Sequence, residues 1–541
     1  MRHKYLFFII GLSILPAIPF FTSNDLLHTH DGLVHLPRLA AYFHALADGN
    51  FPVRIAGYLN YGYGLPLFNF IYQFPYWVGS LLLLLGFGLV NAFKLSLILS
   101  FILSGISMYL FGKEFFGDEK KGFLVAIFYQ FAPFRMVELL VRGSYGEVYA
   151  YAFLPAVLYG IALLNNKRKG LGFLVTSLST FFLITSHNSV SLLFFGACFL
   201  FILFTSRKIK EMIIPLFSLF WGLIMASFYW FPALYDHKYT YGNLYMQNLY
   251  KDHFVPIQNF FIPNFNNDPR LFTEGISTFL GLFQIVGFVL AMFLLTKKLE
   301  KNTKRIFWYC LVLLAVSFFM MSSLSQFIWG ASFSSFLRQF QFPWRFLALA
   351  VFSLSILSVS FLYNKTFSKK TPYIMLIIFT VLSVALYWKA SLGYKKIDEN
   401  YYKNFPLNTT YYGETDVIWS AGPAKKYPKK TLEIIGGQGK VTNFQKKNHY
   451  QTFTSTSDRG ISVLSNTQYF PGWSAYIDGN EVPIQFQDAN NRGNITFDIP
   501  SGKHEVLIKF EETKPRLVAD IISLIGFVLL IPVLWIFSRK K

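Results

Sequence analysis

The stretch from Ser189 to Lys210, SVSLLFFGACFLFILFTSRKIK, decides the class of fold. Its first 18 residues carry no charge, and a helix needs about 20 predominantly apolar residues to cross a bilayer. Three basic residues then follow within four positions, namely Arg207, Lys208 and Lys210. A long apolar run that ends at a basic loop is typical of a membrane-spanning helix whose basic end lies in the cytoplasm.

The composition of the whole chain extends this pattern. Of its 541 residues, 53% are hydrophobic and only 14% are charged, which excludes an ordinary soluble globular protein. The net charge of +21 does not indicate a nucleic-acid partner, because Lys and Arg cluster between apolar stretches, where they determine topology. The two cysteines, Cys198 and Cys310, lie inside apolar stretches, so neither a disulfide framework nor a cysteine metal site is indicated.

Thirteen apolar stretches follow one another along the chain. The sequence therefore predicts a polytopic α-helical membrane protein with about 12–13 hydrophobic helices. The stretches are 5–21, 66–90, 93–111, 122–134, 148–164, 171–186, 189–206, 212–234, 275–296, 305–323, 344–363, 372–391 and 517–537.

Basic loops predict the orientation in a cell membrane. Five of them alternate with apolar stretches, at 167–169, 207–210, 297–305, 365–370 and 539–541. The positive-inside rule places these loops and both termini in the cytoplasm, and loops 134–147, 235–274 and 324–343 outside. Counting forward from Arg2 and Lys4 instead puts 134–147 inside. We therefore expect one stretch between 66 and 134 not to cross fully, with 66–73 at or in the membrane surface; the alternative is that one basic loop is not cytoplasmic.

Residues 392–516 have a different pattern. β-branched and aromatic residues alternate with polar ones at 431–435, 495–499 and 505–510, with glycine-containing turns between them. This indicates short antiparallel strands and predicts a small extracytoplasmic β-sandwich. The predicted organisation is a membrane domain at 1–391 with a first outer loop at 22–65, the β domain at 392–516, and an anchoring helix with a basic tail at 517–541.

The first outer loop carries the best candidate for chemistry. His28, His30 and Asp31 follow the first apolar stretch directly, and ionisable groups kept at the membrane mark functional sites by default. From Pro37 onward, apolar residues recur with a helical period, which predicts a short amphipathic helix on the membrane. Residues 50–64 are rich in Gly and Tyr and suit either stacking on a sugar ring or an interfacial aromatic belt.

Three motifs resemble a known family. They are His30 to Arg38 (HDGLVHLPR), Gly49 to Arg54 (GNFPVR) and Tyr469 to Gly479 (YFPGWSAYIDG). With many spans and an outer domain, they resemble the GT-C membrane glycosyltransferases, and within these the YfhO-type branch. The resemblance implies transfer of a sugar from a polyprenyl-phosphate donor to an acceptor outside the membrane, with Asp31 as the base. It further implies a glycan acceptor such as a teichoic-acid-type cell-wall polymer, and an upstream glycosyltransferase that makes the donor.

Such chemistry needs a carboxylate at the acceptor hydroxyl and cations at the departing phosphate. Arg38, Arg54, Arg142, Arg338 and Arg345 lie in or beside outer loops and are the candidates for contact with the phosphate. The resemblance to GT-C enzymes also implies an acidic contribution from the second outer loop, and Glu138 or Glu147 matches it. The Asp-x-Asp pattern of some relatives is missing, which puts a bound divalent metal in doubt. His30 and His35 are expected to position groups or bind the acceptor rather than hold a metal, since no further ligand is evident. No cofactor is predicted.

Each of these residues also has a purely structural interpretation. Asp31 could cap the surface helix, Glu138 could pair with Arg135 or Arg142, and each arginine could contact lipid headgroups. His187 is interpreted only as a polar turn residue. Two other functions remain open. A transporter or flippase of lipid-linked sugar would predict repeats and charged or broken mid-span helices, and a non-catalytic scaffold would use the β domain to bind glycan.

Overall fold

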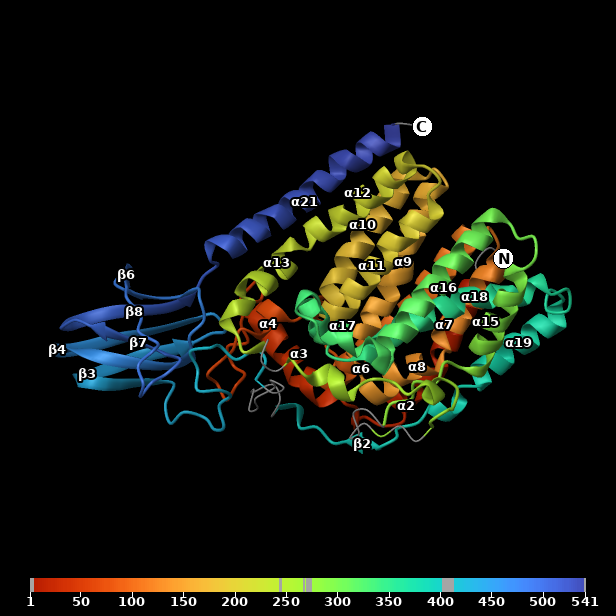
Figure 1. Ribbon diagram of the computed structural model, residues 1–541. Helices are drawn as coiled ribbons and strands as arrows, with labels where there is room; N and C mark the ends of the chain where they lie inside the picture. The colour runs from red at the N-terminus through yellow and green to blue at the C-terminus, as the bar shows by residue number, and fades with distance from the viewer. Residues whose placement is uncertain (1–3, 243–245, 266–267, 269–274, 401–412, 540–541) are drawn as a thin grey trace.

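A computed structural model describes residues 4–242, 246–265, 268, 275–400 and 413–539 (Figure 1). Within these ranges, nine helical segments are long and apolar enough to cross a membrane, or up to eleven when two sharply bent helix pairs each count as one span. A β-sheet domain extends from one side of the helices. The predicted class, a polytopic helical membrane protein with a C-terminal β domain, is confirmed. Arg2, Lys540 and Lys541 lie outside the described residues.

The nine single spans follow the chain order. They are Lys4–Phe21 (with α1, Lys4–Ser13, and α2, Ile18–Phe21), α6 (Leu89–Phe116), α9 (Glu147–Asn165), α10 (Lys169–Ser186), α11 (Asn188–Thr205), α16 (Lys301–Met321), Pro343–Tyr363 (η8, Pro343–Phe346; α18, Leu347–Leu357; η9, Ser358–Tyr363), Lys370–Tyr387 (with α19, Lys370–Leu382) and Lys514–Phe537 within α21 (Lys514–Arg539).

The other four predicted stretches are also helical but irregular. α7 (Glu119–Gln130) is bent by 57° from the segment Pro133–Arg142, and α12 (Ile209–Met225) is bent by 67° from Ser227–Tyr239, which contains α13 (Ser227–Tyr235). The first bend occurs because the residue before Pro133, Ala132, is extended at ψ 139°, as expected before proline.

Two of these four stretches are too short to cross alone. α5 (Phe74–Leu84) and α15 (Leu282–Leu295) have 11 and 14 residues. At a rise of ~1.5 Å per residue α5 spans roughly 16 Å, about half of a typical hydrocarbon core. This length fits the expectation that one stretch between 66 and 134 does not cross fully. The segment preceding it, α4 (Leu67–Phe70), is buried and contacts α13.

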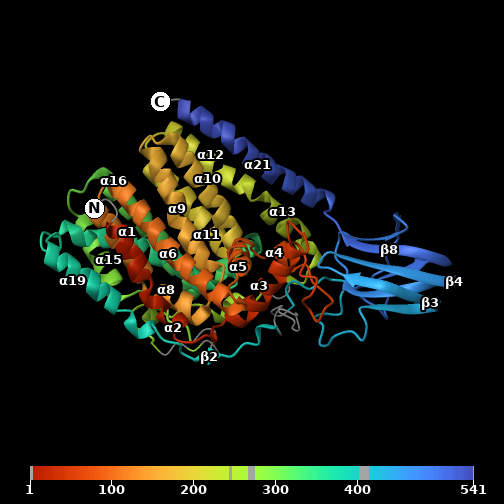
Figure 2. The ribbon, with the colours of Figure 1, turned by 180° about the vertical axis from the view of Figure 1, so that it is seen from behind.

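The surface helix of the first outer loop differs from the prediction in its start and its burial. α3 spans Gly32–Ala47, so Pro37 lies inside it rather than in its first turn. The Thr29 hydroxyl accepts a hydrogen bond from the Gly32 N–H (3.1 Å) and so satisfies the helix start. One face of α3 packs against α5 and α6 instead of lying freely on a membrane, and Figure 2 shows α3 beside α5.

The C-terminal domain is antiparallel, as predicted, but its six strands belong to one hydrogen-bonded sheet rather than to two packed sheets. The order is β3-β4-β8-β5-β6, with β7 pairing the second half of β4. Register shifts near Gly436 and Gly437, where bulges bend a strand, allow one continuous sheet to enclose a core. The strands are β3 (Leu432–Lys446), β4 (Tyr450–Gln468), β5 (Trp473–Ile477), β6 (Asn480–Val482), β7 (Asn494–Ile499) and β8 (Gly502–Phe510).

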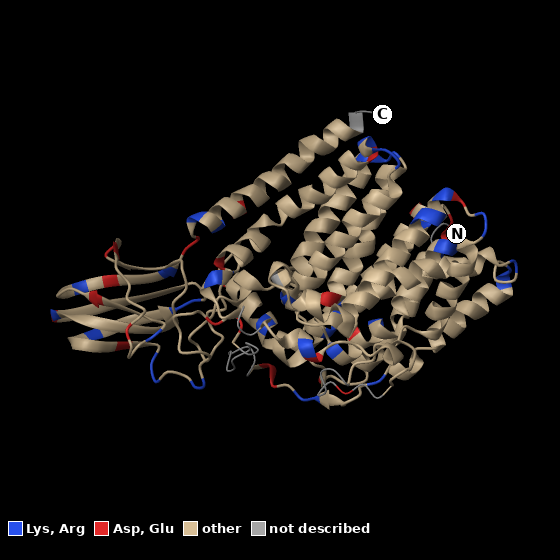
Figure 3. Ribbon diagram, in the orientation of Figure 1, with Lys and Arg blue, Asp and Glu red and all other residues tan. Residues whose placement is uncertain are grey.

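Two contacts join parts of the chain that are distant in sequence. The short strand β1 (Leu26–Leu27) pairs with β2 (Tyr394–Lys395), and α21 runs from the β domain back along α13, α12 and α10 (Figure 1). Figure 3 shows Lys and Arg gathered at the end of the helices that carries both chain termini, away from the β domain. Lys and Arg also lie on the β domain and at the opposite end of the helices in the same view.

Candidate functional site

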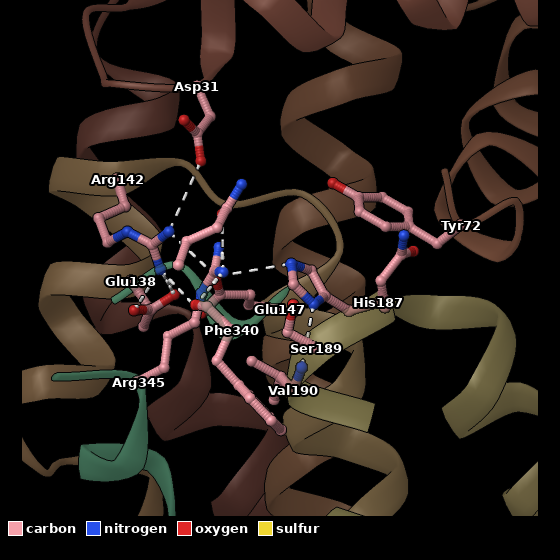
Figure 4. A network of polar contacts seen from close by, with 12 residues as sticks. Asp31, Tyr72, Glu138, Arg142, Glu147, His187, Ser189, Val190, Phe340 and Arg345 are labelled. Atoms are coloured by element: carbon pink, nitrogen blue, oxygen red, sulfur yellow. Dashed lines mark hydrogen bonds and ion pairs between the residues drawn. The ribbon is translucent and has the colours of Figure 1, made fainter. Parts of the chain in front are cut away.

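A buried ion network joins two elements that are distant in sequence (Figure 4). The Arg142 guanidinium donates to both oxygens of Glu138 (2.7 and 2.8 Å) and forms a bidentate pair with Glu147 (2.8 and 3.0 Å). Arg345 donates to the same Glu147 carboxylate from Nε (3.1 Å). All four side chains are almost fully buried, at 0–7% exposure. Burial of charges at this level requires such close pairing.

Local backbone geometry places these side chains. Arg142 ends a π-helical turn, η2 (Val137–Arg142), and Glu147 opens α9, so only the turn at 143–146 separates them. Gly143 adopts a φ of +59°, and a Cβ there would lie 2.4 Å from the Thr29 hydroxyl oxygen. The first outer loop can therefore pack directly on this turn. π-turns inside helices are frequent at functional sites.

The same close packing fixes Asp31 beside the network. The backbone N–H of Asp31 donates to the carbonyl of Arg142 (2.9 Å). Asp31 occupies the N-cap position of α3, but its side chain makes no capping hydrogen bond, so the capping interpretation does not hold. Its carboxylate lies 3.9 Å from Arg142 and is 26% exposed. Burial raises the pKa of the Asp31 carboxyl, and the Arg142 charge opposes that rise. An exposed carboxylate with a raised pKa is suited to accept a proton.

The histidines of the first outer loop have different surroundings. His35 is buried, with Nδ1 2.8 Å from the Tyr76 hydroxyl and Nε2 3.2 Å from the Tyr72 hydroxyl, so both ring nitrogens are engaged. Burial lowers the pKa of His35 well below its usual value. Burial and, to a lesser extent, the Arg142 charge lower the pKa of His30 to about 4. Both rings are therefore neutral at physiological pH.

The predicted arginines divide into three groups. Arg38 is buried on α3, and its charge acts on the Asp31 carboxyl. Arg54 lies elsewhere, paired with Glu512 (3.0 Å) and Asp520 (2.7 Å) near the start of α21. Arg338 donates to the backbone carbonyls of α17 (Gln326–Gly330). Thus Arg142, Arg345 and Arg38 come together with Asp31, Glu138 and Glu147, whereas Arg54 and Arg338 do not.

Sequence reasoning missed one member of the site, His187. Its Nδ1 accepts the N–H of Val190 (3.2 Å), which leaves the ring proton on Nε2. That Nε2 lies 3.6 Å from Glu147 Oε1, and Tyr72 stacks on the ring at 5.2 Å (Figure 4). Burial lowers the pKa of His187 to about 3, so the ring is neutral. The available signal was a lone polar ring between two apolar stretches, which is where membrane proteins keep functional groups.

An apolar groove of about 520 Å³ lies at the opposite end of α3 from Asp31. It lies between the second half of α3 and α5, and Ser80 is its one hydroxyl-bearing lining residue. The lining residues are Phe43, Leu46, Ala47, Phe51, Trp77, Ser80, Leu81 and Leu84. Within the described part of the chain, no group of three or more His, Cys, Asp or Glu side chains could hold a metal ion.

Comparison with known proteins identifies the membrane domain. The family model described as "6-pyruvoyl-tetrahydropterin synthase related domain; membrane protein" matches residues 68–392, more than half of the chain. The chain belongs to this family. The part shared with the 6-pyruvoyl-tetrahydropterin synthase related membrane proteins contains Glu138, Arg142, Glu147, His187 and Arg345, while Asp31 precedes it. No curated protein matches the chain.

The solved structures to which this chain is similar include the following two, both at low sequence identity. One is the arabinofuranosyltransferase AftD from Mycobacteria, with a TM-score of 0.45 and 14% identity over 73% of this chain and 27% of that chain. The other is ArnT from Cupriavidus metallidurans bound to undecaprenyl phosphate, with a TM-score of 0.40 and 11% identity over 75% of this chain and 77% of that chain. The chain thus spans only about 27% of AftD. Since TM-scores below 0.5 do not establish a common fold, the function rests on the site itself.

Proposed function

We propose that this protein is a GT-C-type membrane glycosyltransferase that moves a sugar from a polyprenyl-phosphate donor to an acceptor hydroxyl outside the membrane. One observation carries the proposal. The Asp31 carboxylate is held at the edge of a buried arginine–glutamate network, partly exposed, and used neither as a helix cap nor in a close ion pair. A retained, incompletely paired carboxylate at the membrane surface is suited to chemistry rather than to stability.

The residues divide the reaction between them. The acceptor oxygen bonds to the anomeric carbon as the bond from that carbon to the donor phosphate oxygen breaks, and the phosphate keeps the electron pair. Asp31 takes the proton of the acceptor hydroxyl, a step worth roughly 10²–10⁴-fold in rate. Arg345, Arg38 and Arg142 supply positive charge beside the leaving phosphate. Glu147 positions two of them, since it binds Arg142 and Arg345 together, and Glu138 holds Arg142 from the other side.

The surroundings support a lipid donor and a polar acceptor. The apolar groove on α3 suits the prenyl chain of a donor whose phosphate lies near Asp31 and Arg38 at the other end of the same helix. We propose that His30 orients the acceptor side of the site, and that His35, whose ring nitrogens both contact tyrosine hydroxyls, acts only through Tyr72 and Tyr76. Arg54 and Arg338 are left out of the proposed site because they lie apart from Asp31, Arg54 at the start of α21 and Arg338 at the end of α17.

The finer assignments follow from the sequence motifs. We propose that both termini are cytoplasmic and that the β domain and the site face outward, in line with the distribution of Lys and Arg (Figure 3). Membership of the YfhO-type branch, an upstream donor-making glycosyltransferase and a teichoic-acid-type glycopolymer as acceptor stay predictions of the resemblance.

The deciding experiment is Asp31→Asn, assayed for sugar transfer in membranes supplied with polyprenyl-phosphate sugar. We expect transfer to fall by roughly 10²–10⁴-fold, the value of a general base, with normal insertion and an unfolding temperature no lower than that of the wild type. Asp25→Asn is the matched control, because Asp25 lies in the same outer loop and takes no part in the network. Transfer by Asp31→Asn at the wild-type rate contradicts the assignment, and wild-type protein that moves the donor across the bilayer without consuming it indicates a transporter instead.

A further inference from the structure

The lipid-facing side of α16 does not stop where the helix ends. Along this span, Val312, Val316 and Phe319 are 37%, 42% and 38% exposed and follow one another at helical spacing. In a membrane-spanning helix, apolar side chains left uncovered by the protein contact lipid. The Phe319 ring then lies 6.4 Å from that of Phe327 in α17, beyond the end of the span. The apolar stripe therefore continues onto the following segment.

That segment, residues 322–340, exposes large apolar side chains along its length. It contains η6 (Ser323–Ser325), α17 and η7 (Ser332–Phe340). Leu324, Phe327, Phe333 and Phe336 are 75%, 70%, 82% and 57% exposed. Four side chains of this kind within 13 residues form a patch that water would strongly disfavour.

We propose that residues 322–340 form an interfacial segment that lies in the membrane surface, with Leu324, Phe327, Phe333 and Phe336 in contact with lipid acyl chains. The bilayer is the occupant because the patch continues the lipid-facing stripe of a spanning helix without interruption. The segment also has the two-sided character of an interfacial helix. Leu337 and Phe340 are buried on its inner side.

Polar contacts hold the segment in this position. The Arg338 guanidinium donates to the carbonyls of Trp329 and Gly330, which ties η7 to α17. The hydroxyl of Ser189 donates to the Gln339 carbonyl (2.7 Å), which ties η7 to the start of α11. The apolar residues therefore point outward because the fold fixes them there.

The position of the segment has a consequence for the site. Arg345 donates to the carbonyl of Phe340 (2.7 Å) and to the side-chain oxygen of Gln341 (2.8 Å) at the end of η7. The lipid-embedded segment thus holds the backbone group that orients Arg345. The same segment, η7, therefore contacts lipid on one side and is hydrogen-bonded to Arg345 at its end.

Cysteine accessibility tests the proposal without requiring any activity. The native Cys198 and Cys310 are fully buried, so they contribute little background. Phe333→Cys removes no packing, because the side chain is 82% exposed. Opened membrane fragments, in which both faces meet the reagent, are treated with a polar, membrane-impermeant maleimide. Lys440→Cys on the exposed surface of β3 is the aqueous control, and Val316→Cys, 42% exposed on the spanning helix α16, is the lipid control.

We expect Phe333→Cys to react at least about tenfold more slowly than Lys440→Cys, which corresponds to about 1.4 kcal/mol, and at a rate similar to Val316→Cys. Phe327→Cys repeats the measurement on α17. Labelling of both positions at the Lys440→Cys rate overturns the proposal. So does protection in native membranes that is lost when the purified protein is reconstituted into phosphatidylglycerol–phosphatidylcholine vesicles, since a protein partner then covers the patch. The labelling does not depend on sugar transfer, so a wild-type protein that proves inactive in the transfer assay would leave this result unchanged.

Discussion

Two arginine networks in this protein contain the same numbers of arginines and carboxylates, but they differ in how completely the carboxylates are paired. The first joins Arg142 and Arg345 to Glu138, Glu147 and Asp31. The second lies where the β domain meets the helices, and it joins two arginines to three carboxylates as well. Its pairs are Arg54 with Glu512 and Asp520, and Arg516 with Asp236.

In the network at the domain junction, each of the three carboxylates has an arginine nitrogen within 3.0 Å. Asp236 also accepts from the Asn69 amide (3.0 Å), and Arg516 donates to the Pro471 carbonyl (2.8 Å). These contacts connect the start of α21, α4 and the loop before β5. A network whose carboxylates are all paired holds parts together, and we assign the junction a structural role.

The site network leaves one carboxylate incompletely paired. Asp31 is 3.9 Å from Arg142, beyond hydrogen-bond distance, and retains 26% exposure. A buried arginine in this chain is therefore not by itself evidence for substrate binding. The informative feature is a carboxylate that the network holds in place without using it.

The largest expected difference between the two networks is in stability. Arg142→Leu leaves Glu138 and Glu147, at 0% and 2% exposure, without their main partner, and such a loss costs about 3–5 kcal/mol. Arg54→Leu leaves Glu512 and Asp520 at 24% and 19% exposure, so water can partly compensate. Thermal unfolding in detergent is therefore expected to show a greater loss for Arg142→Leu, and an equal or reversed order would contradict the comparison.

Local features of the sequence predicted most of the fold. Apolar length is a local property, so all thirteen stretches proved helical, and alternation revealed the strands. Asp31, Arg142 and Glu147 were found because short loops hold few charges. Arg54 could not be placed in this way, because its partners lie 458 and 466 positions away in the chain. Pairing over such distances depends on packing that no local pattern records.

His187 illustrates the opposite difficulty. Its sequence context, one ring between two apolar stretches, is compatible with a turn residue, and the structure does give it that role through the Val190 N–H. Only the fold brings its other nitrogen to Glu147. One side chain thus caps a helix and faces the site, and the sequence indicated at most the first property.

The two roles of His187 can be separated by substitution. His187→Ala removes the cap of α11 and is expected to cost about 1 kcal/mol of stability. His187→Asn keeps a capping side chain and restores most of that stability, but it lacks the Nε2–H that faces Glu147. If the site requires that donor, sugar transfer by both variants falls while only His187→Ala is less stable. Full transfer by His187→Asn would restrict His187 to its capping role.

The smallest expected effect is a shift in the pH dependence of transfer. In the proposed role Asp31 accepts a proton only when ionised, so kcat/KM is expected to fall as the pH drops through its pKa, which burial raises. Arg38 opposes that rise, and Arg38→Gln should therefore move the acid limb to higher pH. Arg338→Gln, which removes a cation bound to α17, should not move it.

Ionisation of Asp31 is expected to lower the stability of the folded protein, although transfer requires it. A carboxyl whose pKa is raised by folding binds its proton more tightly in the folded state, so its contribution to stability falls as the pH rises through that pKa. Asp31→Asn is therefore expected to unfold at the same or a higher temperature than the wild type at neutral pH, although its transfer is lost. A lower unfolding temperature would mean that the Asp31 charge stabilises the network, as the carboxylates do at the junction, and would remove the distinction between the two networks.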